Sequence, residues 1–132
     1  MAEETRWKQR FSNYRKSLKN LETAINLDNP DLVQKAGIIQ FFEISFELAW
    51  KLLKDYLQAQ GFNEVKSPRA SIKKAFEIEI IKDGTAWLEA LENRNLSAHT
   101  YDEATSDLII NEITNTYYPL LHNLAEKMSS YE

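Results

Sequence analysis

Cysteine is absent from this chain of 132 residues, and glycine and proline are scarce, with three of each. Without cysteine the protein can form neither disulfides nor thiolate-ligated metal sites. The glycines are scattered, so the sequence carries no glycine-rich loop of the kind that cradles phosphates. Few turn-forming residues favour long helices joined by short turns, and the length suits one helical domain over residues 1–132.

Long apolar segments are lacking as well. No stretch approaches the roughly twenty apolar residues that a membrane span requires. The N-terminus is not followed by the apolar run of a signal peptide. The hydrophobic fraction of 43% and charged fraction of 27% are ordinary for a globular protein. We therefore expect a cytoplasmic protein that does not associate with membranes.

Only two histidines are present, and they form no H-x-x-x-H pair or compact cluster with carboxylates. We therefore expect no metal site and no cofactor. The net charge of −4 argues against general nucleic-acid affinity, because nonspecific binding depends on phosphate neutralisation. Basic side chains are nevertheless concentrated in two groups, which either contact an RNA backbone or form solvated helix faces. The groups are Arg6, Lys8, Arg10, Arg15, Lys16 and Lys19, and then Lys66, Arg69, Lys73 and Lys74.

Apolar residues recur at intervals of three or four in the N-terminal segment, which predicts a helix of about twenty residues. They are Trp7, Phe11, Tyr14, Leu18, Leu21 and Ile25. Asn29-Pro30 then predicts a helix cap followed by proline at the first helical position. This next helix is expected to run to Gln60, with Gly61 as its stop.

The second helix is apolar around most of its circumference. One seam consists of Ile39, Phe42, Phe46, Ala49, Leu53 and Tyr56, and further apolar residues lie outside it at Ile38, Phe41, Leu48, Trp50 and Leu52. Such a helix must be buried on more than one side, so one partner surface could come from a second subunit. Glu43, Glu47 and Lys51 interrupt this surface, and Glu47 and Lys51 form a favourable i,i+4 pair. We interpret these charges as structural or interfacial.

Three further helices are predicted from their start signals. Ser67-Pro68 begins a third helix and Asp83-Gly84-Thr85 a fourth. The last should begin near Thr100, because residues 100–103 fit a T-x-x-E capping box, and Pro119 should kink it near Asn115. Together the patterns predict an all-α, antiparallel up-and-down bundle of four to five helices.

The junction before the last helix carries the candidate chemistry. Arg94, His99 and Tyr101 follow one another in the spacing R-x4-H-x-Y. One helix should end near Ala98, which places His99 at a break where the long Arg94 side chain can reach it. Histidine can both accept and donate a proton near neutral pH, and arginine can bind a phosphate through two parallel N–H bonds. Asn95 adds a polar group that could orient a phosphate or the imidazole ring.

The second histidine offers no comparable setting. His122 lies on the last helix among Tyr118, Leu121 and Ala125, and we expect it to be a partly buried packing residue. An Arg–His pair at short spacing also arises by chance, and a histidine at a helix end can simply bond a terminal carbonyl.

Residues 94–101 resemble the R-x4-H-x-Y motif of small HEPN-type proteins, including a polar residue directly after the arginine. Their surroundings resemble the branch named nucleotidyltransferase substrate-binding proteins. The similar segments are Phe42–Lys51, Ser67–Arg69 and Asn93–Glu103. The resemblance extends from the first helix to the last.

This resemblance implies a HEPN-like bundle of four to five helices that forms a homodimer and binds a minimal nucleotidyltransferase. In the HepT-like branch the bundle is a toxin with metal-independent ribonuclease activity. The nucleotidyltransferase is its antitoxin and attaches AMP to the motif tyrosine. Carried over to this chain, Arg94 and His99 would be catalytic, Asn95 would assist, and Tyr101 would be the modification target.

Two alternatives remain open beside the ribonuclease toxin. The chain could be a non-catalytic subunit that recruits substrate to a nucleotidyltransferase, or a plain helical interaction module. The first two hypotheses both predict a nucleotidyltransferase partner, and only the toxin predicts that His99→Ala abolishes RNA cleavage.

Overall fold

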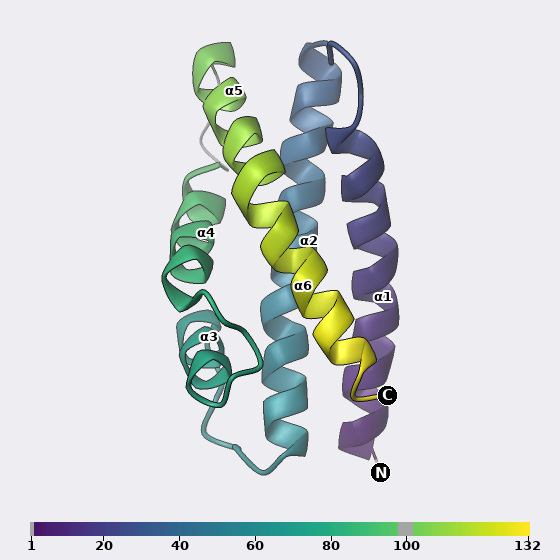
Figure 1. Ribbon diagram of the computed structural model, residues 1–132, viewed down its shortest axis with the longest axis vertical. Helices are drawn as coiled ribbons and strands as arrows, with labels where there is room; N and C mark the ends of the chain where they lie inside the picture. Colours follow the sequence, from purple (N-terminus) through teal and green to yellow (C-terminus); the bar gives the residue numbers. More distant parts are fainter. Residues whose placement is uncertain (1, 98–101) are drawn as a thin grey trace.

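The structure is a computed structural model that describes residues 2–97 and 102–132. All regular elements in these ranges are helical, and the last three follow one another without a break. They are α1 (Ala2–Ile25), α2 (Leu32–Ala59), α3 (Pro68–Glu77), α4 (Gly84–Ser97), α5 (Glu103–Glu112), the π-helix η1 (Ile113–Tyr117) and α6 (Tyr118–Ser129). Figure 1 shows an up-and-down arrangement in which α5, η1 and α6 form one long final helix. The predicted all-α bundle is confirmed.

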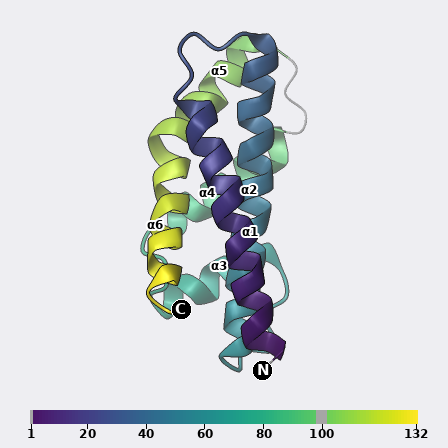
Figure 2. The same ribbon diagram turned by 90° about the vertical axis from the view of Figure 1, so that its right-hand side faces the viewer.

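The central helix of the bundle is α2. It lies antiparallel to α1 in both views, and it also contacts α3, α4, α5 and α6 (Figures 1 and 2). Its apolar circumference is therefore covered mainly within one chain, which removes the need for a second subunit to bury it. No helix among the residues that the structure describes is long and apolar enough to cross a membrane.

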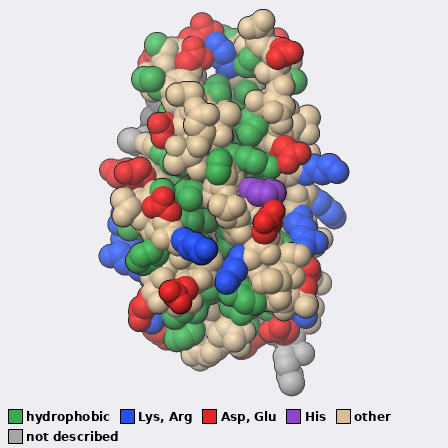
Figure 3. Space-filling view, in the orientation of Figure 1, with side chains coloured by type: hydrophobic (Ala, Val, Ile, Leu, Met, Phe, Trp, Pro, Cys, Tyr) green, Lys and Arg blue, Asp and Glu red, His purple; other side chains and the backbone are tan. Residues whose placement is uncertain are grey.

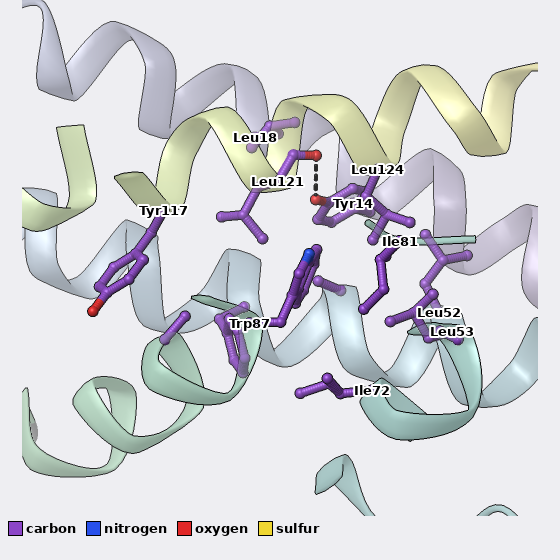
Figure 4. Close-up of a cluster of buried hydrophobic side chains, with 14 of the residues drawn as sticks. Tyr14, Leu18, Leu52, Leu53, Ile72, Ile81, Trp87, Tyr117, Leu121 and Leu124 are labelled. Atoms are coloured by element: carbon purple, nitrogen blue, oxygen red, sulfur yellow. Dashed lines mark hydrogen bonds between the residues drawn. The ribbon is translucent and has the colours of Figure 1, made fainter. Parts of the chain in front are cut away.

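The core is assembled from the predicted apolar stripes. On α1 the side chains from Trp7 to Leu21 in the stripe are buried, and Figure 4 shows Tyr14 and Leu18 beside Leu121 of α6. The Tyr14 hydroxyl donates a 2.7 Å hydrogen bond to the Leu121 carbonyl and so ties α1 to α6. Burial raises the pKa of Tyr14 well above its usual value, and the neighbouring Tyr118 adds to the effect.

Two predicted helix starts are wrong. α2 begins at Leu32 rather than at Pro30, because Asp31 and Gln34 form a reciprocal capping box. α5 begins at Glu103, where the Asp102 side chain accepts hydrogen bonds from the backbone and hydroxyl of Thr105. Thr100, the predicted cap, lies outside the described residues.

Other boundaries agree with the sequence. Ser67 caps α3 with Pro68 in its first turn. α2 ends at Ala59, and Gly61 adopts a φ of 101°, a left-handed conformation that glycine accepts without strain.

The final helix changes geometry where Pro119 was expected to kink it. Proline has no N–H to donate, and its ring crowds the carbonyl four residues earlier, at Asn115. The chain responds with η1, in which the N–H of Tyr118 bonds to the Ile113 carbonyl, five residues back. The predicted irregularity is therefore present, in the form of a π-helix.

Candidate active site

Arg94 lies in the last turn of α4, where the partial negative charge of a helix C-terminus favours a cation. Its Nη2 lies 3.3 Å from Oε2 of Glu47 on α2, and its side chain is 31% exposed. The interaction joins the middle of the central helix to the end of α4 and keeps the guanidinium at the surface.

Glu47 is held by further neighbours on its own helix. Its Oε2 accepts a 3.1 Å hydrogen bond from the Trp50 indole, and Oε1 lies 3.4 Å from Nζ of Lys51. Partial burial opposes ionisation of this carboxyl, but the hydrogen bonds from Trp50 and Lys51 and the charge of Arg94 outweigh it. The pKa of Glu47 therefore lies below its usual value, and the carboxylate stays charged beside Arg94.

The residue before Arg94 forms a second link. Asn93 donates a hydrogen bond from Nδ2 to the hydroxyl of Tyr117, which belongs to η1. The Tyr117 ring stacks on Phe42 of α2, with centroids 5.5 Å apart. Burial raises the pKa of Tyr117, the Asn93 hydrogen bond opposes this, and Glu112 and Glu89 add to the rise. The last turn of α4 is thus fastened to α2 and to the final helix.

α4 and α5 are separate helices, because Asp102 before α5 is extended. The described part of α4 ends at Ser97, and α5 begins after the extended Asp102, whose pKa is lowered chiefly by the hydrogen bond from the Thr105 backbone. The predicted catalytic His99 and the predicted modification target Tyr101 fall between them and lie outside the described residues. Asn95 is exposed on the same final turn as Arg94.

A groove lies beside Arg94. Its volume is about 340 Å³, and it runs along the outer face of α2 where α4 approaches. The lining residues are Gln40, Glu43, Ile44, Glu47, Leu48, Lys51 and Arg94. Among residues 2–97 and 102–132, no three histidine, aspartate or glutamate side chains gather as a metal ion would require.

The second basic group lies elsewhere. Lys66 precedes α3, and Arg69, Lys73 and Lys74 lie on it, beside the start of α4 rather than its end (Figure 1). Lys74 is engaged with Glu77 at 3.2 Å and lies over the Phe62 ring. Figure 3 shows acidic and basic side chains interspersed on the face in view, with no uniformly basic surface there. The fold therefore does not bring this group to Arg94.

The expectation for His122 holds in part, because its ring stacks on Tyr118 with centroids 6.0 Å apart, but the residue is more exposed than expected. Its side chain is 47% exposed and lies 2.9 Å from Oε1 of Glu126, because this face of α6 points to solvent.

Sequence reasoning missed Glu47 and Tyr117 as neighbours of the motif. Glu47 was recognised only through its spacing to Lys51, and no pattern in the chain pairs either residue with α4.

These features define a class of protein: an all-α bundle that carries an arginine in the last turn of a helix. A histidine and a tyrosine follow this arginine in the sequence, in the spacing R-x4-H-x-Y. The chain belongs to the family described as nucleotidyltransferase substrate binding protein like, whose model matches residues 9–130. The resemblance stated from the sequence is therefore confirmed.

Two further proteins are similar to this chain. A protein of Haemophilus influenzae named probable ribonuclease HepT is 32% identical over 87 residues, which cover 56% of each chain. The similarity thus spans little more than half the length of that relative. A crystal structure of a Thermus thermophilus protein has the same fold, with a TM-score of 0.80 and 29% identity over 86% of this chain and 97% of the other.

Proposed function

We propose that this protein is a HEPN-type, metal-independent endoribonuclease toxin. A partner minimal nucleotidyltransferase would hold it inactive by adenylylating Tyr101. The observation that carries the proposal is the placement of Arg94 at the surface end of α4, held by Glu47 and followed by His99 and Tyr101 in the motif spacing. The name of the Haemophilus relative, probable ribonuclease HepT, supports the same activity.

The reaction requires one attack and one departure at phosphorus. The ribose 2′-oxygen attacks the phosphorus while a base removes the 2′-proton, and an acid protonates the 5′-oxygen as the P–O5′ bond breaks. The products are a 2′,3′-cyclic phosphate and a 5′-hydroxyl. His99 would transfer a proton and Arg94 would stabilise the negative charge that develops on the phosphate oxygens.

One histidine cannot easily be both the acid and the base in a single step. A homodimer that brings two motifs together would supply the second imidazole. Val33 in the first turn of α2 is 81% exposed and Leu108 on α5 is 68% exposed. Figure 1 shows α5 and the start of α2 at the same end of the bundle. Exposed apolar side chains are typical of protein–protein contacts, and a second copy is the partner that we propose for these two.

Adenylylation of Tyr101 would explain the control of the toxin. In that step the tyrosine oxygen attacks the α-phosphorus of ATP, and the bond to the β-phosphate breaks to release pyrophosphate. The added AMP would place bulk and negative charge close to Arg94 in sequence and so compete with RNA phosphate. The basic residues Lys66, Arg69, Lys73 and Lys74 would contact only a longer RNA, because they lie away from Arg94.

The family description favours a second candidate, a substrate-binding subunit of a nucleotidyltransferase complex without its own catalysis. Both candidates require the nucleotidyltransferase partner, and they differ in whether His99 cleaves RNA.

Induced expression in cells, combined with RNA cleavage by purified protein in EDTA, separates the two candidates. The variants are His99→Ala and, as a matched control, His122→Ala, which removes the exposed histidine of α6. Wild type and His122→Ala should arrest growth and cleave RNA, whereas His99→Ala should do neither, with cleavage lowered about 10²- to 10⁴-fold. If wild type and His99→Ala behave alike at equal protein levels, the substrate-binding subunit is the better description.

A further inference from the structure

The side chains that line the groove beside Arg94 change in character along its length. Its α2 positions are spaced by three or four residues, so they form one face of the helix. At 1.5 Å of rise per residue, Glu43 and Lys51 lie about 12 Å apart along the axis. Arg94 and Lys51, with Glu47 paired to both, provide a cationic part with one carboxylate between two cations, and Glu43 provides an acidic end away from Lys51.

The middle of the groove is apolar. Ile44 is 40% exposed, and Leu48 one turn further along is partly buried. Exposed aliphatic side chains between a cationic and an acidic part offer a flat apolar contact for a ring system. The volume of about 340 Å³ lies within the range of small-ligand sites in proteins.

Glu43 is the unusual member of this set. Glu47, one turn away, interacts with Trp50, Lys51 and Arg94. Glu43 is partly buried and has no hydrogen bond or ion pair with any residue in the described part of the chain. Its two oxygens can therefore accept hydrogen bonds from a ligand bound in the groove.

We propose that this groove binds the base next to the scissile phosphate in single-stranded RNA, and that Glu43 makes guanine the preferred base. The proposal rests on the ribonuclease function proposed above. Arg94 would hold the phosphate, Ile44 and Leu48 would contact the face of the base, and Glu43 would accept hydrogen bonds from its edge.

The preference for guanine follows from donor patterns. A carboxylate only accepts hydrogen bonds, and guanine presents two adjacent donors, N1–H and the N2 amino group, which match its two oxygens. Adenine and cytosine present an amino group beside an acceptor nitrogen. Uracil presents one N–H between two carbonyl oxygens, and a carboxylate repels these oxygens because both groups are acceptors. Unpaired bases expose these edges, whereas a duplex hides them.

Short oligonucleotides with one cleavable ribonucleotide test the proposal. All other sugars are deoxy, and the bases on either side of the single cleavable bond are varied among the four. At one of these two base positions, substrates with guanine should have a kcat/KM at least about tenfold higher than substrates with uracil. This is the discrimination expected of a bidentate contact. Glu43→Gln should reduce that ratio to below about threefold, because the amide no longer offers two acceptors and can donate to the carbonyl oxygens of uracil. Glu64→Gln makes the same charge change on an exposed residue outside the groove and should keep the preference.

Noncleavable 2′-O-methyl versions of the same oligonucleotides provide a second measurement, the dissociation constant. If wild type cleaves no oligonucleotide yet binds guanine selectively through Glu43, the nuclease proposal fails and the groove assignment stands. If wild type cleaves all four sequences equally, or if Glu43→Gln keeps the guanine preference, the groove assignment is overturned and the nuclease proposal stands.

Discussion

Nη2 of Arg94 lies 3.3 Å from Oε2 of Glu47, although 47 residues separate the two in sequence. The carboxylate is itself fixed by Trp50 and Lys51, so it can hold the guanidinium in one orientation. The orientation matters because an arginine binds a phosphate most strongly when its planar guanidinium already points two N–H groups at the phosphate oxygens. In the function proposed above, Glu47 would therefore prepare Arg94 for phosphate binding.

Replacing Glu47 tests this role. Glu47→Ala should lower kcat for RNA cleavage about tenfold with little change in KM, because Arg94 loses its orientation while its charge remains. Glu47→Gln keeps a carbonyl acceptor and should retain more activity. Glu126→Ala removes a glutamate that pairs with His122 on α6 and does not line the groove, so it serves as the control. Faster cleavage by Glu47→Ala would mean instead that the carboxylate competes with RNA phosphate for Arg94.

Tyr117→Phe should weaken the second attachment of α4. The change removes the hydroxyl that accepts from Asn93 and keeps the ring stacked on Phe42. We expect a loss of about 1 kcal/mol in the free energy of unfolding, measured by chemical denaturation, together with slower RNA cleavage. Tyr131→Phe is the matched control, since Tyr131 stacks on Tyr56 and its hydroxyl bonds to no described residue. Equal effects of both changes would contradict the expectation.

The buried ion pair between α1 and α2 should matter for stability. Nε of Arg10 lies 2.8 Å from Oδ2 of Asp55, whose side chain is only 1% exposed. Asp55→Ala leaves the Arg10 charge near the core without a partner and should cost up to about 3 kcal/mol. Glu132→Ala breaks the exposed pair with Arg15 and should cost less than about 1 kcal/mol. Urea denaturation of both variants measures the contrast, and similar losses would disprove it.

Stability should fall at alkaline pH, partly through Tyr118. Partial burial, the hydrogen bond to Glu22 and the charge of Glu22 raise the pKa of Tyr118 from 10.0 to about 12. Above pH 10 the unfolded chain releases the phenolic proton while the folded chain retains it. The stabilisation from this group is therefore complete below pH 10 and is lost as the pH rises toward about 12. Unfolding free energies across this range should decline less steeply for Tyr118→Phe than for wild type.

The helices were predictable because burial on one face imposes a period that the sequence displays directly. Trp7, Phe11 and Tyr14 are buried as their spacing predicts. Helix starts were less predictable, since several residues near each junction can cap. Asp31 acts as the cap of α2 although Asn29-Pro30 offered an equally plausible signal.

The site was predictable only in part. The motif spacing identified Arg94 and its neighbours in sequence, because residues in one turn and the following junction must lie close together. Glu47 and Tyr117 reach the same place from other helices, and their positions depend on how the helices pack. No local pattern encodes such packing. His122 was expected to be more buried than it is, because its apolar neighbours in sequence did not reveal which face of α6 turns to solvent.

The π-helix also sets the phase of the final helix. Each residue of an α-helix advances the chain by about 100°, and η1 accommodates one more residue than an α-helical turn would. The side chains of α5 are therefore rotated relative to α6 by that angle. In this orientation Nζ of Lys35 on α2 lies 3.0 Å from Oδ1 of Asp107 on α5. Deleting a single residue from Ile113–Tyr117 would turn the side chains of α5 by about 100° relative to α6. The irregular turn thus sets which face of α5 lies against α2.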